Sequence, residues 1–479
     1  MREWPLHPDE CAPWGVDAGR GYNLPVPVTL LRLCAAFAVT LVFAAAGALA
    51  QPTRIDVVTP IAPDLAAFGP SAIGVRTLTA VDRNRPDILR TKEGEPTARY
   101  DRRLVLEVWY PATLAPGQTP GGTYQTVTRD PSIAVTLQGR AVRDAAVSST
   151  GGPFPLVILS HGYPGNRYLM GHLGENLASK GFIVVSIDHA DSTYDDQQAF
   201  ASTLYNRSFD QLFVLDEMAR LAAPASGSFL SGRLDAARTG IVGYSMGGYG
   251  LVNTIGGGYS VLATTMRGAP ANRLLAERAA SNPAYRAAID TRVKAAIAIG
   301  PWGMQVGMWD AEGLRGIRTP VLFVGGSVDD VSGYAKGTRA LFEGAVNADR
   351  YLLTFVGANH NAAAPHPAPA ETLGATGRAV IAYAQHADAV WDTVRMNNIL
   401  QHFATAYFDR HLKGDEATQA YFDVIPSGSD AVYAVDREGR EQPTHTYWKG
   451  FKRGTAIGLT LEHATPAPAS PPAPAAGAR

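Results

Sequence analysis

Cysteine is almost absent from this sequence, and the two that occur, Cys11 and Cys34, lie in the first 50 residues. The rest of the chain has no thiol with which to form a disulfide, ligate a metal or act as a nucleophile. An excess of one charge is absent too, because 42 basic residues stand against 43 acidic ones. This balance gives no reason to expect a nucleic-acid partner or an anionic membrane surface.

Motifs for metals and nucleotide cofactors are also missing. The sequence contains no H-E-x-x-H pair, Walker A loop, dinucleotide-binding glycine pattern or EF-hand loop. The scattered histidines show no spacing typical of metal ligands. We therefore expect chemistry that needs no metal and no other cofactor.

A long hydrophobic run is present near the N-terminus. Residues 29–50 read TLLRLCAAFAVTLVFAAAGALA, with an early basic residue and small residues at the end, which is the pattern of a secretory signal peptide. We predict a signal peptide over residues 1–50, cleavage after Ala50, and a periplasmic or secreted protein without a stable membrane partner. An uncleaved membrane anchor is the alternative, because about 18 apolar residues could just span a bilayer.

The body of the chain alternates short apolar runs with helical patterns, which predicts an α/β fold with a mostly parallel sheet and flanking helices. The predicted strands are residues 104–110, 156–160, 182–187, 239–243, 293–299, 321–324 and 351–356. The predicted helices are residues 171–180, 209–221, a segment beginning at 246, and 390–412. We expect the last helix to close the final edge of the sheet.

We predict one folded domain over residues 51–463, with a helical insertion at about 264–292 and a C-terminal extension at about 416–463. Within the extension, we expect residues 421–425, 446–451 and 456–461 to form added strands or an ordered tail. Residues 464–479 are rich in proline and alanine, so we expect a disordered tail.

A nucleophile motif follows the strand at residues 239–243. Residues 243–247 read GYSMG, a G-x-S-x-G pattern between an apolar strand and a helical segment. In that context the glycines permit a tight strand-to-helix turn that exposes the serine at the sheet edge. Ser245 is therefore the predicted nucleophile, and an ordinary glycine-rich turn is the alternative.

A serine needs a base and an orienting carboxylate, which in this arrangement follow the nucleophile in the order acid, then histidine. The strand PVLFVGG leads into SVDD, and the strand YLLTFV leads to His360. We prefer Asp329 to Asp330 as the orienting acid, because it stands three residues past Gly326, where the loop turns back toward the site. A solvated turn aspartate and an unpartnered loop histidine are the alternatives.

Acyl transfer also needs two N–H donors for the oxyanion. The first predicted donor is Met246, directly after the nucleophile, and the second is Tyr163, in the loop HGYPG that follows the strand at 156–160. The Tyr163 side chain is also expected to flank the substrate. A purely structural turn is the alternative for this loop.

These motifs resemble the α/β-hydrolase superfamily, and specifically its exported serine esterases. The segments GVRTLTAVDRNRPDILR, RRLVLEVWYPA, FPLVILSHGYPGNR and FDQLFVLDEM are similar to platelet-activating-factor acetylhydrolases and to dienelactone-hydrolase-like proteins. The order SHGY, GYSMGG, GPW, PVLFVGGSVDD and GANH is similar to cutinases and polyester hydrolases, including PET-degrading enzymes. That resemblance implies that Trp302 binds substrate in the acyl cleft, and an ordinary core tryptophan is the alternative.

The sequence departs from these families at several positions. True dienelactone hydrolases use a cysteine where this chain has Ser245, and the acetylhydrolases take their acid near residues 300–301, where no carboxylate stands. Cutinases are more compact, and the insertion near 264–292 would roof the cleft and disfavour bulky polymers.

The sequence thus predicts an exported serine hydrolase that cleaves carboxylic esters through an acyl-enzyme intermediate. Short-chain acyl esters are the expected small-molecule substrates, and a polyester is a further candidate. A serine peptidase or amidase of the same fold is one alternative. A catalytically inactive binding protein with this fold is the other.

Overall fold

The structure is a computed structural model that describes residues 53–467. The predicted signal peptide and most of the predicted tail lie outside the described residues. Within residues 53–467, no helix has both the length and the apolar character needed to cross a membrane.

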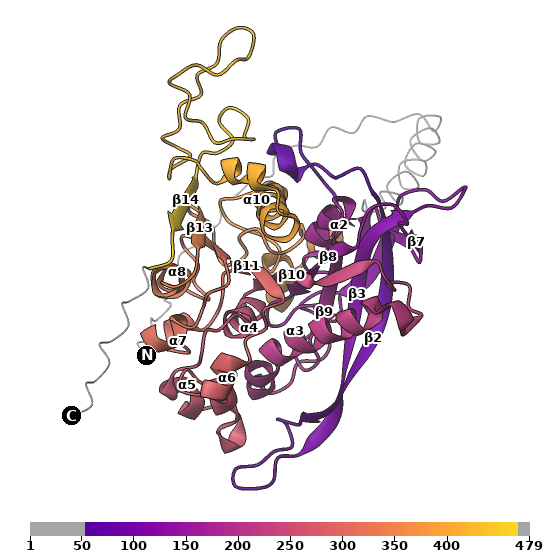
Figure 1. The fold of residues 1–479 in the computed structure, drawn as a ribbon, viewed down its shortest axis with the longest axis vertical. Helices are drawn as coiled ribbons and strands as arrows, with labels where there is room; N and C mark the ends of the chain where they lie inside the picture. Colours follow the sequence, from indigo (N-terminus) through magenta and orange to yellow (C-terminus); the bar gives the residue numbers. More distant parts are fainter. Residues whose placement is uncertain (1–52, 468–479) are drawn as a thin grey trace, which may run out of the picture. The chain divides into compact units, whose positions relative to one another are not determined.

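Six parallel strands form the middle of the central sheet, as predicted (Figure 1). They are β8 (Phe154–Ser160), β9 (Ile183–Asp188), β10 (Leu234–Tyr244), β11 (Val293–Ile299), β12 (Val321–Gly326) and β13 (Arg350–Phe355). Their spatial order is β13-β12-β11-β10-β8-β9. The chain runs outward from β8 to β9 and then returns to β10 on the other side of β8. The loops after β8 and β10 therefore leave from adjacent strands, where α/β sheets usually place their sites.

Antiparallel strands extend the sheet at both edges. On one side β9 pairs with β3 (Arg99–Thr113), which forms a long hairpin with β2 (Ala72–Pro86) and also pairs with the short β7 (Ala146–Val147). The short β6 (Val142–Arg143) follows β2. On the other side β14 (Leu459–Ala464) pairs with β13. The prediction found only residues 104–110 of the hairpin, because β2 mixes polar with apolar residues and is only partly buried.

Helices cover both faces of the sheet (Figure 1). Alternate residues of β8 enter different cores: Val157 and Leu159 pack with α2 (Gly171–Ser179) and α10 (Thr393–Lys413), and Leu156 and Ile158 pack with α3 (Phe200–Ala222) and α4 (Met246–Thr254). This alternation is that of strands buried on both faces.

The prediction that residues 390–412 close the sheet edge is wrong. Helix α10 lies on the face of the sheet, where Phe408 and Leu412 come so close to Gly240 of β10 that a side chain there would clash. Strand β14 covers the edge instead. The reason is that α10 is buried along most of its length and needs a wide apolar surface, which a sheet face provides and an edge does not.

A second, small sheet stands beside α2. It contains β1 (Thr53–Arg54), β5 (Ala134–Gly139) and β4 (Gly122–Val127). Buried Glu175 of α2 fixes the segment after β5, because its carboxylate accepts hydrogen bonds from the N–H groups of Arg140 and Ala141 at 2.7 and 3.0 Å. The β4–β5 hairpin is thereby tied to the body of the protein.

The predicted insertion is helical in short pieces. It contains α5 (Val261–Thr265), the 3-10 helix η4 (Ala271–Arg278) and α6 (Pro283–Ala287). The Tyr205 hydroxyl of α3 donates to Glu277 at 3.0 Å, and the Arg278 guanidinium lies 4.0 Å from the centre of the Phe209 ring. The insertion thus packs on α3.

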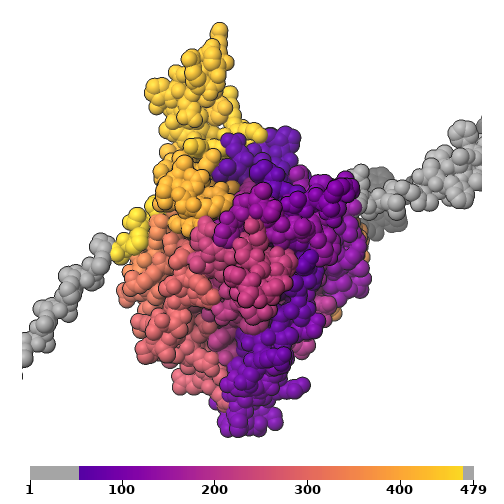
Figure 2. Space-filling model, turned by 45° about the vertical axis from the view of Figure 1, so that its right-hand side comes forward, coloured from indigo at the N-terminus to yellow at the C-terminus, as the bar shows by residue number. Residues whose placement is uncertain are grey.

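The C-terminal extension is mostly irregular and projects from the rest of the described residues (Figure 2, yellow). Only β14 is a strand there, so residues 421–425 and 446–451 are not added strands but belong to the ordered tail, the other expected alternative. Aromatic side chains of those segments are buried instead: Trp448 and Phe451 contact Phe403 of α10 with ring centres 6.1 and 5.9 Å apart. Their apolar residues therefore fill a helix surface and do not pair in a sheet.

Because several histidines are buried, we expect the folded protein to lose stability in acid. Burial lowers the pKa of His172 and His366 to about 4 and that of His189 and His402 to about 3. Between an unfolded-state pKa of about 6.5 and these values the unfolded chain binds more protons, so the free energy of unfolding falls as the pH falls. For each histidine, a folded-state pKa that is one pH unit lower than the unfolded-state pKa corresponds to about 1.4 kcal/mol, so we expect a loss of several kcal/mol between pH 7 and pH 4.

Urea unfolding at a series of pH values measures this loss. The His402→Gln variant should have a flatter pH dependence than the wild type, whatever its stability at pH 7. A wild-type unfolding free energy that stays constant from pH 7 to pH 4 would contradict the prediction.

Candidate active site

Ser245 stands on a sharp turn between β10 and α4. Its backbone has φ 53° and ψ −114°, a conformation that a serine rarely adopts. The glycines on either side are needed because the backbone is crowded: a Cβ on Gly243 would lie 2.4 Å from the Gly247 carbonyl oxygen, and one on Gly247 would lie 1.9 Å from that of Ser160. The G-x-S-x-G motif thus forms the strand-to-helix turn that the sequence predicts.

The structure brings together the three residues predicted as a triad. The Ser245 hydroxyl lies 2.9 Å from Nε2 of His360, and Nδ1 of His360 lies 2.8 Å from Oδ2 of Asp329. Because an ionised carboxylate only accepts, Nδ1–H donates to Asp329 and Nε2 is left to accept the serine proton. This is the arrangement in which a histidine can act as a general base.

Asp329, and not Asp330, holds the histidine. Its Oδ1 accepts from the N–H groups of Val331 and Ser332 at 2.9 and 2.8 Å, which leaves Oδ2 for His360. Burial raises the pKa of Asp329, but the hydrogen bonds from His360 and from these N–H groups outweigh it, so the pKa lies below its usual range. Asp330 is exposed and lines the adjacent cavity.

Both predicted oxyanion donors lie beside the nucleophile. Met246 is the first residue of α4, so its N–H has no acceptor within the helix. The loop that holds Tyr163 is close to Ser245, because a Cβ on Gly162 would lie 3.1 Å from the Ser245 Cβ. Within the described part of the chain, neither the Met246 nor the Tyr163 N–H takes part in a hydrogen bond. Their donor role stays a prediction.

Helix α3 packs against the loop that holds Tyr163, a contact that was not predicted. Buried Arg207 donates through Nη1 to the His161 carbonyl oxygen and through Nη2 to that of Gly162 at 2.9 Å. Gln211 donates to the Gly247 carbonyl oxygen at 3.0 Å. Burial lowers the pKa of Arg207 to about 9. The signal in the sequence is the i, i+4 spacing of these polar residues on one helix face.

A second Ser–His–Asp arrangement lies in this buried layer. Ser160 Oγ is 2.8 Å from Nε2 of His189, whose Nδ1 is 2.9 Å from Oδ2 of Asp210. Arg102 donates to both oxygens of Asp210 at 2.9 and 3.0 Å. Ser160 and Asp210 have no exposed surface, and His189 is 1% exposed, so no substrate reaches them. We interpret this arrangement as support for the loop after β8.

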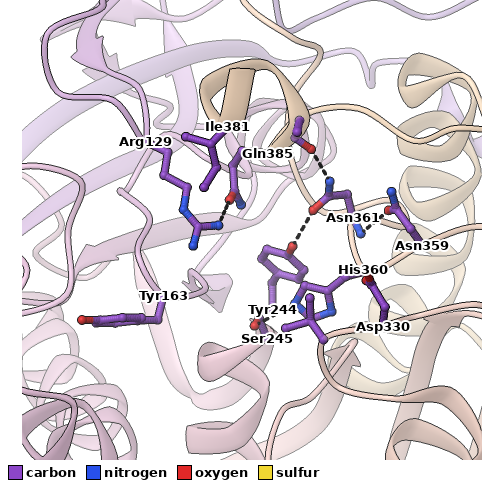
Figure 3. A pocket seen from close by; sticks show the side chains of 12 residues that line it. Arg129, Tyr163, Tyr244, Ser245, Asp330, Asn359, His360, Asn361, Ile381 and Gln385 are labelled. Carbon is purple, nitrogen blue, oxygen red and sulfur yellow. Dashed lines mark hydrogen bonds between the residues drawn. The ribbon is translucent and has the colours of Figure 1, made fainter. Parts of the chain in front are cut away.

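A cavity of about 280 Å³ opens beside Ser245 and His360 (Figure 3). Its wall comes from the turn after β4 with Arg129, the loop after β13 with Asn359 and Asn361, and a segment that contains α9 (Val380–Ala384). Asn361 joins the loop after β13 to β10 and α9, because its Oδ1 accepts from the Tyr244 hydroxyl at 3.1 Å and its Nδ2 donates to the Ala384 carbonyl oxygen at 2.7 Å.

The predicted roof over the cleft is wrong. The insertion at 264–292 contributes nothing to the lining of this cavity, whereas α9 does. Polar contacts hold the insertion elsewhere: Asn272 N–H donates to Glu93 in the turn between β2 and β3 at 2.7 Å, and Glu277 binds Tyr205 of α3. Helix α9 was not predicted from the sequence because only five residues form it, and most of them are exposed.

Trp302 is close to the nucleophile but does not line this cavity. The backbone N–H of Trp302 donates to the Ser245 carbonyl oxygen at 3.2 Å. Its half-buried ring lies against Phe200 and Tyr249, with ring centres 5.3 and 6.0 Å away. Phe200 in turn contacts Tyr163, which does line the cavity, at 5.4 Å. A substrate role for Trp302 stays a prediction.

The sheet order, the turn at Ser245 and the Ser245–His360–Asp329 arrangement define an α/β-hydrolase, which confirms the predicted fold class. A family model described as PET hydrolase-like matches residues 122–272. This match runs from β4 to the start of η4 and includes Ser245 and Tyr163.

Curated relatives agree with the predicted resemblance. The chain is 26% identical to a bis(hydroxyethyl) terephthalate hydrolase of Streptomyces coelicolor, over 48% of this chain and 57% of that protein. It is 25% identical to cutinase est2 of Thermobifida alba, over 43% and 52%. It is 29% identical to a platelet-activating factor acetylhydrolase of Cavia porcellus, over 22% and 33%. The chain thus spans about half the length of the first two relatives. The resemblance to both branches of ester hydrolases is confirmed.

Proposed function

We propose that this protein is a serine hydrolase that cleaves carboxylic esters through an acyl-enzyme intermediate. The observation that carries the proposal is the hydrogen-bonded series from Ser245 to His360 to Asp329 at the mouth of a cavity. The names of the relatives support an ester as the bond that is cleaved.

The geometry supports the following steps. His360 takes the Ser245 proton through Nε2 while the serine oxygen attacks the ester carbonyl, and Asp329 stabilises the imidazolium. The N–H groups of Met246 and Tyr163 donate to the oxyanion. His360 then gives the proton to the leaving alcohol, and a water molecule activated by the same imidazole releases the acid.

Short-chain esters are the proposed small-molecule substrates. A cavity of about 280 Å³ is at the small end for ligand pockets and accommodates a short acyl or a single aromatic group. Apolar Val331 and Ile381 stand on its rim, 51% and 44% exposed, where a longer apolar chain would lie. Together with the relative that acts on bis(hydroxyethyl) terephthalate, this rim favours a polyester as the second candidate.

We further propose that the protein is exported, with residues 1–50 as its signal peptide. The support is the hydrophobic run and the small residues before position 51. N-terminal sequencing of the protein recovered from the periplasm or medium tests this, and an intact N-terminus on membrane-bound protein would contradict it.

A series of p-nitrophenyl esters from acetate to dodecanoate tests the proposed activity. We expect kcat/KM for acetate and butyrate to exceed that for dodecanoate by about tenfold or more, because the long chain exceeds the cavity. The matching p-nitroanilides distinguish a peptidase or amidase, since faster cleavage of an anilide than of its ester would contradict the proposal. A fluorophosphonate probe tests the inactive-protein alternative, because an inert serine would not be labelled.

A further inference from the structure

Arg129 brings a positive charge to the active-site cavity. It lies in the turn between β4 and β5, and Figure 3 shows its guanidinium beside Gln385 on one side of the cavity. Nη1 of Arg129 donates to Oε1 of Gln385 at 2.8 Å. Gln385 is only 8% exposed, so a buried amide fixes the position of the guanidinium.

This charge is not neutralised by the protein. Over residues 53–467 Arg129 forms no ion pair, and its side chain has no hydrogen bond other than that with Gln385. An arginine has five N–H donors, so several remain free to bind a ligand. Asp330 is the acidic residue in the lining, and in Figure 3 it lies beyond His360, on the opposite side from Arg129. A half-buried cation without a counter-ion favours the binding of an anion.

We propose that the cavity binds esters with a carboxylate at the end remote from the scissile bond, and that Arg129 holds this carboxylate. The planar guanidinium matches a carboxylate with two parallel hydrogen bonds. The rings of Tyr163 and Tyr244 and the side chain of Ile381 line the space near Ser245 and suit an apolar ring or short chain. The substrate class is therefore the half-ester of a dicarboxylic acid, or an ester whose alcohol carries an acid. This inference rests on the proposed ester hydrolase function for the identity of the substrate.

Binding to protein that cannot turn over gives the first test. In a Ser245→Ala background, the affinity is measured by calorimetry for methyl 4-carboxybenzoate and for methyl 4-carbamoylbenzoate, which has the same shape without the charge. We expect Arg129→Gln to weaken binding of the carboxylate by about tenfold to a hundredfold more than binding of the amide. Arg129→Lys should restore part of the preference, because it keeps the charge but loses the fork. Unchanged affinity ratios both for this pair and for 4-carboxyphenyl acetate against 4-carbamoylphenyl acetate would overturn the inference.

Turnover by the wild-type protein gives the second test and places the carboxylate. The acyl-side pair is the same two methyl esters, and the alcohol-side pair is 4-carboxyphenyl acetate and 4-carbamoylphenyl acetate. For each pair, the ratio compared is kcat/KM of the charged ester divided by kcat/KM of the neutral ester. Arg129→Gln should lower this ratio by about tenfold or more in one of the two pairs. The decrease should be smaller at high salt, which screens the charge. Equal ratios in wild type and variant for both pairs would overturn the inference.

A matched control removes an arginine elsewhere. Arg83 is 81% exposed, pairs with Asp101 on the β2–β3 hairpin and has no part in the cavity, so Arg83→Gln should leave all ratios unchanged.

Failure of this inference and failure of the proposed function give different results. Hydrolysis of the neutral esters with no effect of Arg129→Gln overturns the subsite alone. Absence of any hydrolysis with a charge-dependent affinity overturns the proposed function and supports the subsite.

Discussion

Ser245→Ala lowers kcat for a p-nitrophenyl ester by about four to six orders of magnitude and leaves the fold intact. The loss is this large because the hydroxyl is the group placed to attack, 2.9 Å from the base, and water would have to replace it without the same positioning. The fold should persist because the serine is 7% exposed at the cavity mouth and alanine fits the same space. Alanine at φ 53° is no more strained than serine there.

The second serine in a Ser–His–Asp arrangement provides a matched control for this experiment. Ser160→Ala removes the hydroxyl between His189 and Gln211, which are 2.8 and 3.0 Å away, and leaves buried polar groups unpaired. We expect it to lower the free energy of unfolding by about 1–3 kcal/mol while kcat stays within about tenfold of wild type. Stopped-flow assays and urea unfolding measure both quantities. Equal loss of kcat in the two variants would contradict the assignment of Ser245.

The parallel core of the fold can be predicted from the sequence because each of its strands contains a short, continuous apolar run. Strand β11 (VKAAIAI) and strand β13 (RYLLTF) are examples, and both are buried on both sides. Strand β2 could not be predicted in this way, because its alternation of polar and apolar residues is interrupted and much of it is exposed. The position of α10 depends on which surface is left uncovered, and local periodicity does not carry that information.

The triad can be predicted because its chemistry requires residue types in a fixed order at strand ends. The wall of the cavity cannot, because it is assembled from segments with no common pattern. Arg129 precedes the nucleophile strand and Asn359 follows the last parallel strand, yet both line one cavity. The Arg207 contacts to the loop after β8 likewise depend on tertiary packing of α3. In the sequence, the one feature that indicated these contacts was the row of polar and ionisable residues on a buried face of α3.

Asp329→Asn should lower kcat by about 10⁴ because it reverses the orientation of the imidazole protons. In the wild type, Oδ1 accepts from the Val331 and Ser332 N–H groups and Oδ2 accepts from His360. An asparagine keeps its oxygen toward those two N–H groups, so its NH₂ faces His360. Nδ1 must then accept, the proton moves to Nε2, and Nε2 can no longer take the proton of Ser245.

Asp330→Asn removes the same charge from the next residue and is the matched comparison. Asp330 is exposed and makes no hydrogen bond with His360, so we expect kcat within about tenfold of wild type. Steady-state kinetics at pH 8, with melting temperatures to establish folding, measure both variants. Because the pKa of Asp329 lies below its usual range, the wild-type carboxylate is ionised at this pH, so the comparison measures the loss of the charged form. A larger loss in Asp330→Asn than in Asp329→Asn would show that the carboxylate beside His360 in the structure is not the one that orients the base.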